Sequence, residues 1–114
     1  SQSKKRMNQW GLKESDIQTL QVTFSKFAEI SEVRIFGSRA LGNYKPGSDV
    51  DLAIFENGKT DCATRVSALL NEVLPLPYYF DVVSYAQVQN PEFIDHINRV
   101  GQVLFTREHP PTPQ

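Results

Sequence analysis

Two aspartates separated by one residue are the first feature of this sequence that could do chemistry. Asp49 and Asp51 stand at the start of an apolar run typical of a strand. Residues two apart on a strand project to the same face, with Cα atoms roughly 6.5 Å apart. Two carboxylates on one face repel each other unless a cation lies between them. Mg²⁺ prefers oxygen ligands and usually also holds substrate phosphates, so the pattern predicts a magnesium site.

A Gly-Ser pair, Gly37-Ser38, follows another short apolar run and precedes the aspartates. Glycine lets the backbone turn tightly and approach a ligand closely. If Ser38 opens a short helix, its hydroxyl and the free backbone N–H groups form an anion site. A loop that binds phosphate beside a strand that binds metal predicts a site for magnesium and a triphosphate.

A third carboxylate, Asp81, lies between Phe80 and Val82 in a later apolar run. A charged residue in the middle of a strand costs free energy to desolvate unless it is paired or bound to a metal. Because Phe80 and Val82 face one way, Asp81 must face the other, as a site shared with Asp51 requires. If the two strands are adjacent, the three aspartates predict a two-metal centre for phosphoryl chemistry.

The order and spacing of these residues resemble a known signature. Gly37-Ser38, ten intervening residues and Asp49-Val50-Asp51 form the GS-x10-DxD pattern of the nucleotidyltransferase superfamily related to DNA polymerase β. The segment is similar in particular to the minimal nucleotidyltransferase (MNT) branch, through Arg39, Gly42, Ser48 and Leu52. Asp81 matches the third carboxylate, which that family carries on a later strand.

The resemblance also implies a role for each residue. Gly37 and Ser38 would hold the triphosphate, and Arg39 would contact the phosphates. Asp49, Asp51 and Asp81 would ligate Mg²⁺ in a two-metal site, with Asp81 also orienting or deprotonating the acceptor hydroxyl. Tyr78, Tyr79 and Tyr85 could stack on a nucleobase, although packing in the core or at its rim is the simpler interpretation.

The MNT resemblance implies a magnesium-dependent enzyme that transfers AMP from ATP to a tyrosine of a HEPN-type helical toxin, and so acts as its antitoxin. Either the acceptor would arrive on that partner, or another subunit would complete the site, in an oligomer of like or unlike chains. Two alternatives stay open. One is a non-catalytic antitoxin that acts by direct binding, and the other is a nucleotidyltransferase for a small-molecule acceptor.

The elements that must position these residues follow from the pattern of apolar residues. Helices are predicted over 15–30, with Ser15 as its cap, over 60–74, with Val73 on its buried side, and over 91–100, between Asn90 and Gly101. Strands are predicted over 33–36, 50–55, 79–84 and, at an edge of the sheet, 103–105. Strands alternating with helices predict an α/β (α+β) layered fold. The resemblance makes it a nucleotidyltransferase fold, with helices packed against a small mixed sheet.

Length and composition set the remaining bounds. A chain of 114 residues, 39% hydrophobic and 22% charged, fits one domain and is not typical of disorder. We expect a flexible segment over 1–10, the nucleotidyltransferase domain over 11–106 and a disordered tail over 107–114. The single cysteine excludes an internal disulfide, and a net charge of -1 makes DNA binding unlikely as the main function. No apolar run suits a membrane span or a signal peptide, so a cytoplasmic protein is expected.

Overall fold

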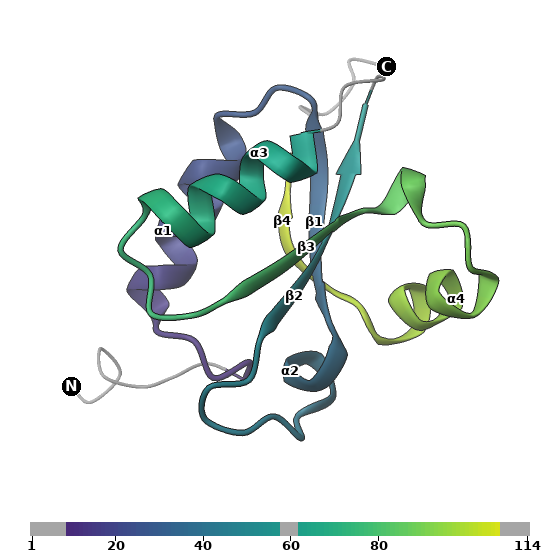
Figure 1. Cartoon of the computed structure of the whole chain (residues 1–114), viewed down its shortest axis with the longest axis horizontal. Helices are drawn as coiled ribbons and strands as arrows, with labels where there is room; N and C mark the ends of the chain where they lie inside the picture. Colours follow the sequence, from purple (N-terminus) through teal and green to yellow (C-terminus); the bar gives the residue numbers. More distant parts are fainter. Residues whose placement is uncertain (1–8, 58–61, 108–114) are drawn as a thin grey trace, which may run out of the picture.

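The computed structural model describes residues 9–57 and 62–107, which form a four-stranded sheet with helices on both faces (Figure 1). The elements follow in chain order: α1 (Glu14–Ser25), β1 (Ile30–Phe36), α2 (Gly37–Leu41), β2 (Val50–Glu56), α3 (Cys62–Ala68), the π-helical turn η2 (Leu69–Val73), β3 (Phe80–Ser84), the 3₁₀ turn η3 (Tyr85–Gln87), α4 (Pro91–Val100) and β4 (Gln102–Thr106). The predicted fold class, a mixed sheet with helices packed against it, is confirmed.

The strands lie in the order β3-β2-β1-β4. β1 pairs antiparallel with both β2 and β4, whereas β2 and β3 are parallel. Parallel neighbours need a crossover connection, and α3 with η2 supplies it here. The strands that carry Asp51 and Asp81 are therefore adjacent, as the predicted shared site required.

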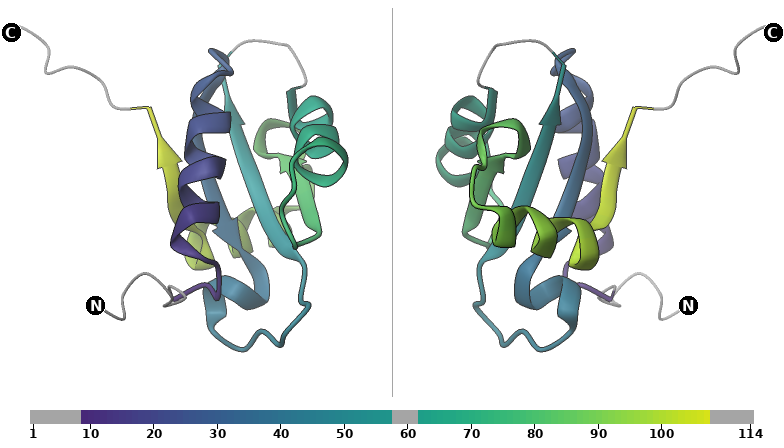
Figure 2. Two further views of the ribbon diagram at one scale, coloured as in Figure 1. Left: turned by 90° about the vertical axis from the view of Figure 1, so that its left-hand side faces the viewer. Right: turned by 90° about the vertical axis from the view of Figure 1, so that its right-hand side faces the viewer.

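The two faces of the sheet have separate apolar clusters. Val50, Leu52 and Ile54 of β2 are fully buried in the larger cluster, which also contains core residues of α1 and α3. Ala53 lies on the opposite face in a smaller cluster that includes Ile97 of α4. Figure 2 shows the same division, with α1 and α3 on one side of the sheet and α4 on the other. Alternate residues of β2 thus serve two faces.

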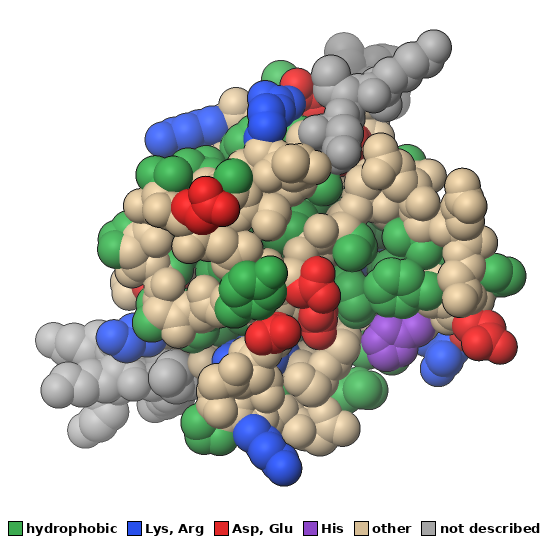
Figure 3. Space-filling view, in the orientation of Figure 1, with side chains coloured by type: hydrophobic (Ala, Val, Ile, Leu, Met, Phe, Trp, Pro, Cys, Tyr) green, Lys and Arg blue, Asp and Glu red, His purple; other side chains and the backbone are tan. Residues whose placement is uncertain are grey.

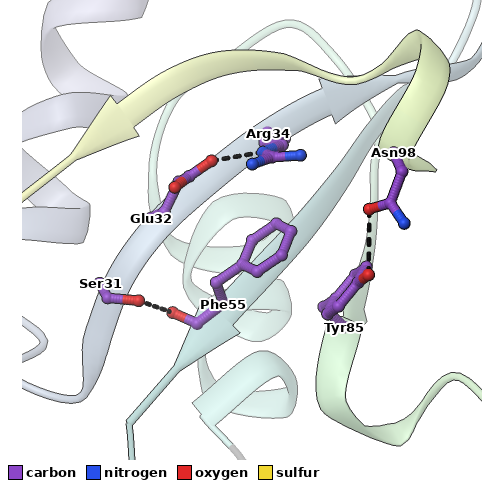
Figure 4. A network of polar contacts seen from close by, with 6 residues as sticks. All are labelled: Ser31, Glu32, Arg34, Phe55, Tyr85 and Asn98. Atoms are coloured by element: carbon purple, nitrogen blue, oxygen red, sulfur yellow. Dashed lines mark hydrogen bonds and ion pairs between the residues drawn. The ribbon is translucent and has the colours of Figure 1, made fainter. Parts of the chain in front are cut away.

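A strip of aromatic and polar side chains holds α4 near one end of its face (Figure 4). The ring of Tyr85 stacks on Phe55 at 4.3 Å, and its hydroxyl donates to Asn98 of α4 at 3.0 Å. The guanidinium of Arg34 lies over Phe55 at 4.8 Å and pairs with Glu32. These contacts join β1, β2, η3 and α4 and cover that end of the face.

The ends of the helices agree only in part with the sequence predictions. Asn90 caps α4 as predicted, its side chain accepting from the N–H of Glu92 at 2.8 Å. The predicted Ser15 cap is wrong, because Lys13 occupies the cap position of α1 without a side-chain bond. Val73 is 67% exposed rather than buried, because the helix ends in the π-helical turn η2, whose wider spacing breaks the α-helical period used to predict its buried side.

The chain next to both termini packs onto the domain. Trp10 falls in the segment predicted to be flexible, yet it is buried, and its indole N–H donates to Gln102 at 2.7 Å. Arg107, predicted to begin the tail, donates to the carbonyl oxygens of Phe27 at 2.8 Å and Ile30 at 3.1 Å. The remaining expected flexible parts, 1–8 and 108–114, lie outside the described residues. No described helix has the length and apolar character to cross a membrane.

Candidate active site

Asp51 and Asp81 lie side by side in the sheet. They are direct partners in the parallel register of β2 and β3, so both side chains project from the face that bears α4. Asp49 comes immediately before β2 and is exposed, as is Asp81. In the space-filling view, acidic side chains gather near the middle of the face toward the viewer, where β2 and β3 lie in Figure 1 (Figure 3). The strands thus bring together the carboxylates that the sequence separates by thirty residues.

The environment of Asp51 makes this carboxyl group hard to ionise. Partial burial raises the pKa of Asp51 to about 6, and the negative charges of Asp81 and Asp49 add to the rise. A group that is costly to ionise beside two other carboxylates suits a bound cation, because a positive charge would offset both repulsions. The electrostatics of the site therefore agree with the chemistry predicted from the sequence.

Gly37 lies against the carboxylate of Asp51. Its φ is 74°, a left-handed conformation, and a Cβ added to it would meet Oδ2 of Asp51 at 2.1 Å. Two separate constraints therefore require glycine at this position. The residue directly follows β1 and begins α2, so the turn of the Gly-Ser pair lies beside Asp51.

Ser38 stands in the first turn of α2, as predicted. Its carbonyl oxygen accepts from the N–H groups of Gly42 at 2.9 Å and Asn43 at 3.2 Å, which closes the short helix. The half-buried side chain of Ser38 makes no hydrogen bond to the described residues. Its hydroxyl is therefore available to a ligand beside Gly37.

Arg39 has a different environment from the one expected. Its side chain is only 4% exposed, and its guanidinium donates to the carbonyl oxygens of Trp10 at 2.8 Å and Ser48 at 2.9 Å. The rings of Tyr44 and Tyr78 lie 5.0 and 5.7 Å from its guanidinium carbon. The predicted phosphate contact has no support in this arrangement. Arg39 instead ties the segment before α1 to the loop that leads into β2.

A comparison with protein families bears directly on this arrangement. Residues 18–110 match the family model described as Polymerase beta, Nucleotidyltransferase. The chain belongs to this family. The nucleotidyltransferase resemblance predicted from the Gly-Ser and Asp-x-Asp pattern is thereby confirmed. Among curated proteins, none matches the sequence.

Solved structures share the fold of this nucleotidyltransferase at low sequence identity. A chain of the crystal structure of a toxin–antitoxin with AMP-PNP superposes with a TM-score of 0.65 and 19% identity, over 85% of this chain and 76% of the other. A protein described as a nucleotidyltransferase from Sulfolobus solfataricus gives 0.53 and 21%, over 93% and 86%. A complex of a tri-AMPylated Shewanella oneidensis HEPN toxin with an MNT antitoxin gives 0.50 and 15%, over 80% and 73%. The resemblance to the MNT antitoxin fold is confirmed.

The donor set of the nucleotidyltransferase suits a hard cation. Within 9–57 and 62–107, no three His, Cys, Asp or Glu side chains form a group that could hold a metal ion. Mg²⁺ is usually bound by one or two carboxylates together with substrate phosphates and water, so the adjacent pair of Asp51 and Asp81 fits it. The closed three-carboxylate cluster expected from the sequence is not preformed.

The tyrosines divide into two groups. Tyr78 and Tyr85 are engaged in the fold, since Tyr78 donates to Asp16 at 2.7 Å and Tyr85 stacks on Phe55. Tyr79 is 60% exposed, and its carbonyl oxygen accepts from the N–H of Val50. Tyr79 immediately precedes β3, two residues before Asp81, so continued strand alternation would direct its side chain to the same face as the aspartates. Of the three tyrosines predicted as stacking candidates, Tyr79 is therefore the one whose side chain is most exposed.

Asn71 is a site-positioning residue that the sequence did not reveal. Its side-chain amide donates to the carbonyl oxygen of Phe80 at 2.9 Å and accepts from the N–H of Phe80 at 2.8 Å. The two bonds fix the residue next to Asp81. No sequence pattern signals them, because the π-helical turn sets where Asn71 faces.

Proposed function

We propose that this nucleotidyltransferase transfers AMP from ATP to a tyrosine hydroxyl of a HEPN-type toxin and thereby acts as its antitoxin. The observation that carries the proposal is the register of Asp51 with Asp81 beside the Gly37 turn. Support for the acceptor comes from the MNT sequence resemblance and from the fold shared with chains described as toxin–antitoxin and MNT antitoxin.

The chain's own residues divide the work between nucleotide and acceptor. Gly37, lacking a side chain, allows the triphosphate to approach the backbone, and the hydroxyl of Ser38 donates to a phosphate oxygen. Asp49, Asp51 and Asp81 would hold Mg²⁺. When bound, this ion would offset the negative charge of the phosphates and of the three carboxylates.

The transfer is a displacement at the α-phosphorus of ATP. The phenolic oxygen of the acceptor forms a bond to that phosphorus, while the bond to the β-phosphate oxygen breaks. Pyrophosphate leaves with the bonding electron pair. The phenolic proton passes to the carboxylate of Asp81, which is exposed on the edge strand β3.

Intact mass spectrometry tests the proposal. The chain is incubated with Mg²⁺, ATP and a HEPN-type protein encoded next to its gene, and the mass of that protein is followed. We expect stepwise additions of AMP with the wild type and none with Asp49→Asn. A tight complex without a mass increase would favour the antitoxin that acts by binding alone. Transfer to a small hydroxylated molecule but not to the protein would favour the small-molecule enzyme.

A further inference from the structure

β3 forms one edge of the sheet, and its outward backbone groups are open over part of its length. The carbonyl oxygen of Tyr79 points inward, since it accepts from the N–H of Val50 at the start of β2. The N–H and C=O of Phe80 point outward, where the Asn71 side chain binds both. Because backbone groups alternate along a strand, the N–H and C=O of Val82 and the N–H of Ser84 also point outward.

The side-chain amide of Asn71 takes the place of a neighbouring strand at Phe80. It offers one donor and one acceptor to a single residue, as the backbone of an adjacent strand would. Beyond it, no described residue pairs with the outward groups of Val82. The hydrogen-bonding ladder thus has one occupied position followed by open ones. Open edges of this kind are templates for another extended chain.

A groove runs along this open edge between α3 and η3. Its volume is about 530 Å³. Its walls include Ala63, Ser67, Glu72, Val82, Ser84 and Gln87. Ser84 is 93% buried, being 7% exposed, and its hydroxyl has no hydrogen-bond partner among residues 9–57 and 62–107. A buried hydroxyl without a partner costs free energy, so this one points to a ligand that supplies the missing bond.

We propose that the acceptor protein binds here through an extended segment that adds a fifth strand beside β3. The proposal rests on the proposed function and specifies how the acceptor reaches the site. The added strand would bond to the N–H and C=O of Val82 and to the N–H of Ser84, and one of its polar groups would bond to the hydroxyl of Ser84.

The geometry of a sheet would then place the acceptor side chain beside Asp81. Neighbouring strands lie about 4.8 Å apart, and paired residues project to the same face. A residue of the added strand opposite Asp81 therefore projects beside that carboxylate, on the face that also bears Asp51. A hydroxyl-bearing side chain at that position would meet the group that takes its proton. Pairing fixes the register, so the neighbours of the acceptor residue in sequence would be kept away from Asp81.

The opposite edge of the sheet is less suited to this role. The side-chain amide of Gln21 on α1 donates to the carbonyl oxygen of Leu104 in β4 at 3.0 Å. β4 is also separated from the aspartates of β2 by β1. An added strand there would be separated from β2 and its Asp51 by two strands, β1 and β4, whereas one beside β3 adjoins Asp81 directly.

Proline at position 82 tests the proposal. The N–H of Val82 points away from β2, so Val82→Pro removes an open donor without removing a bond of the sheet. Val82→Thr keeps both the N–H and the branched shape and is the matched control. The Asp51→Asn variant leaves the residues of β3 unchanged and is expected to transfer little AMP. Its complex with the HEPN-type protein can therefore be studied by amide hydrogen exchange. The readouts are AMP transfer, ATP affinity and exchange at the amides of Val82 and Ser84.

We expect Val82→Pro to lower kcat/KM for the protein acceptor at least tenfold with ATP affinity unchanged, while Val82→Thr stays within twofold of the wild type. We also expect exchange at the amides of Val82 and Ser84 to slow at least tenfold when the HEPN-type protein binds to the Asp51→Asn chain. Transfer by Val82→Pro at the wild-type rate, or unchanged exchange at both amides in the complex, would overturn the added strand.

The exchange measurement also separates this inference from the proposed function. Protection of both amides without AMP transfer by the wild type would reject the enzyme and keep the docking mode. Transfer by the wild type without protection would keep the enzyme and reject the docking mode. Should Val82→Pro fail to fold, exchange in the complex with Asp51→Asn still decides the question.

Discussion

The two ends of one sheet face differ in what covers them. At the acidic end, which comprises Asp49, Asp51 and Asp81, the side chains are exposed or half-buried. At the aromatic end, which comprises Phe55 and Tyr85, the rings stack at 4.3 Å and are tied to α4 through Asn98. Both ends lie on β2, β3 and the turn after β3, with the same side-chain alternation.

In this small domain, one end of the sheet face therefore contributes packing and the other end carries the candidate active site. Between the two ends, Ala53 is fully buried with Ile97 of α4, so the helix closes one part of the face and leaves the other open. The apolar side of β2, which is fully buried against α1 and α3, anchors the strand under both ends. The packing of the rest of the sheet therefore offsets the free-energy cost of holding carboxylates close together at one end.

Removing the central carboxylate should have the largest effect. We expect Asp51→Asn to lower AMP transfer at least about 10³-fold, equivalent to about 4 kcal/mol of transition-state stabilisation, because the site loses both charge and a ligand for Mg²⁺. Phe55→Leu at the aromatic end should lower the melting temperature and leave transfer within a few-fold. Rates by mass spectrometry and thermal unfolding check both variants. Equal losses of activity in the two would contradict the separation of the two ends.

The glycine beside Asp51 provides the next test. Gly37→Ala places a Cβ 2.1 Å from Oδ2 of Asp51, so we expect about a 10²-fold loss of transfer. Gly42→Ala is the matched control, because Gly42 has a φ of 88° but nothing within 4 Å of its added Cβ. Both variants carry the backbone strain of a left-handed residue, about 1 to 2 kcal/mol.

Backbone strain should lower the unfolding temperature of both glycine variants, whereas the contact with Asp51 should lower the activity of Gly37→Ala alone. Unfolding midpoints and transfer rates are measured for both at the same pH. A similar loss of activity in Gly42→Ala would show that the backbone of α2, rather than the contact with Asp51, limits the reaction.

The sequence predicted the parts of the site that depend on local pattern. The Gly-Ser turn, the strand that follows Asp49 and the opposite orientations of Asp81 and its neighbours all follow from residue types and the period of a strand. The adjacency of β2 and β3 could only be required, because the pairing of strands is set by the whole chain. The resemblance to the nucleotidyltransferase family supplied the expected reaction and acceptor, which the residue pattern alone did not.

Arg39 and Asn71 show why the rest was not predictable. A sequence motif gives the position of an arginine but not the direction of its long side chain, which here turns to the carbonyl oxygens of Trp10 and Ser48. Asn71 reaches Phe80 only because a π-helical turn orients it. In both cases the side chain bonds to backbone groups. Those of Arg39 are distant in sequence, and that of Asn71 is separated from it by a turn of unusual geometry.

Replacing Arg39 distinguishes its two possible roles. Arg39→Met keeps the apolar stem and leaves the carbonyl oxygens of Trp10 and Ser48 without their buried donor, so we expect a loss of about 2 kcal/mol in the free energy of unfolding. The affinity for ATP should change less than threefold. Urea unfolding and calorimetric titration of ATP check these values. A tenfold weaker ATP affinity at unchanged stability would instead support the phosphate contact that the family resemblance implied.

The smallest expected effect is the dependence of stability on pH at the acidic end. The pKa of Asp51 is raised to about 6 in the folded protein, so the folded state binds its proton more tightly than the unfolded chain does. This contribution is fully present below about pH 4, near the ordinary pKa of Asp, and is lost as pH rises through 6. Without metal, the free energy of unfolding of the wild type should therefore fall by about 1 kcal/mol relative to Asp51→Asn between pH 4 and 7, after allowance for solvent screening.

Mg²⁺ at ten times its dissociation constant should restore about 1.4 kcal/mol to the wild type at pH 7, because it binds the folded state alone. Asp51→Asn should gain much less. Thermal unfolding with and without Mg²⁺ across this range measures both effects, and an equal gain in the two proteins would place the ion away from Asp51.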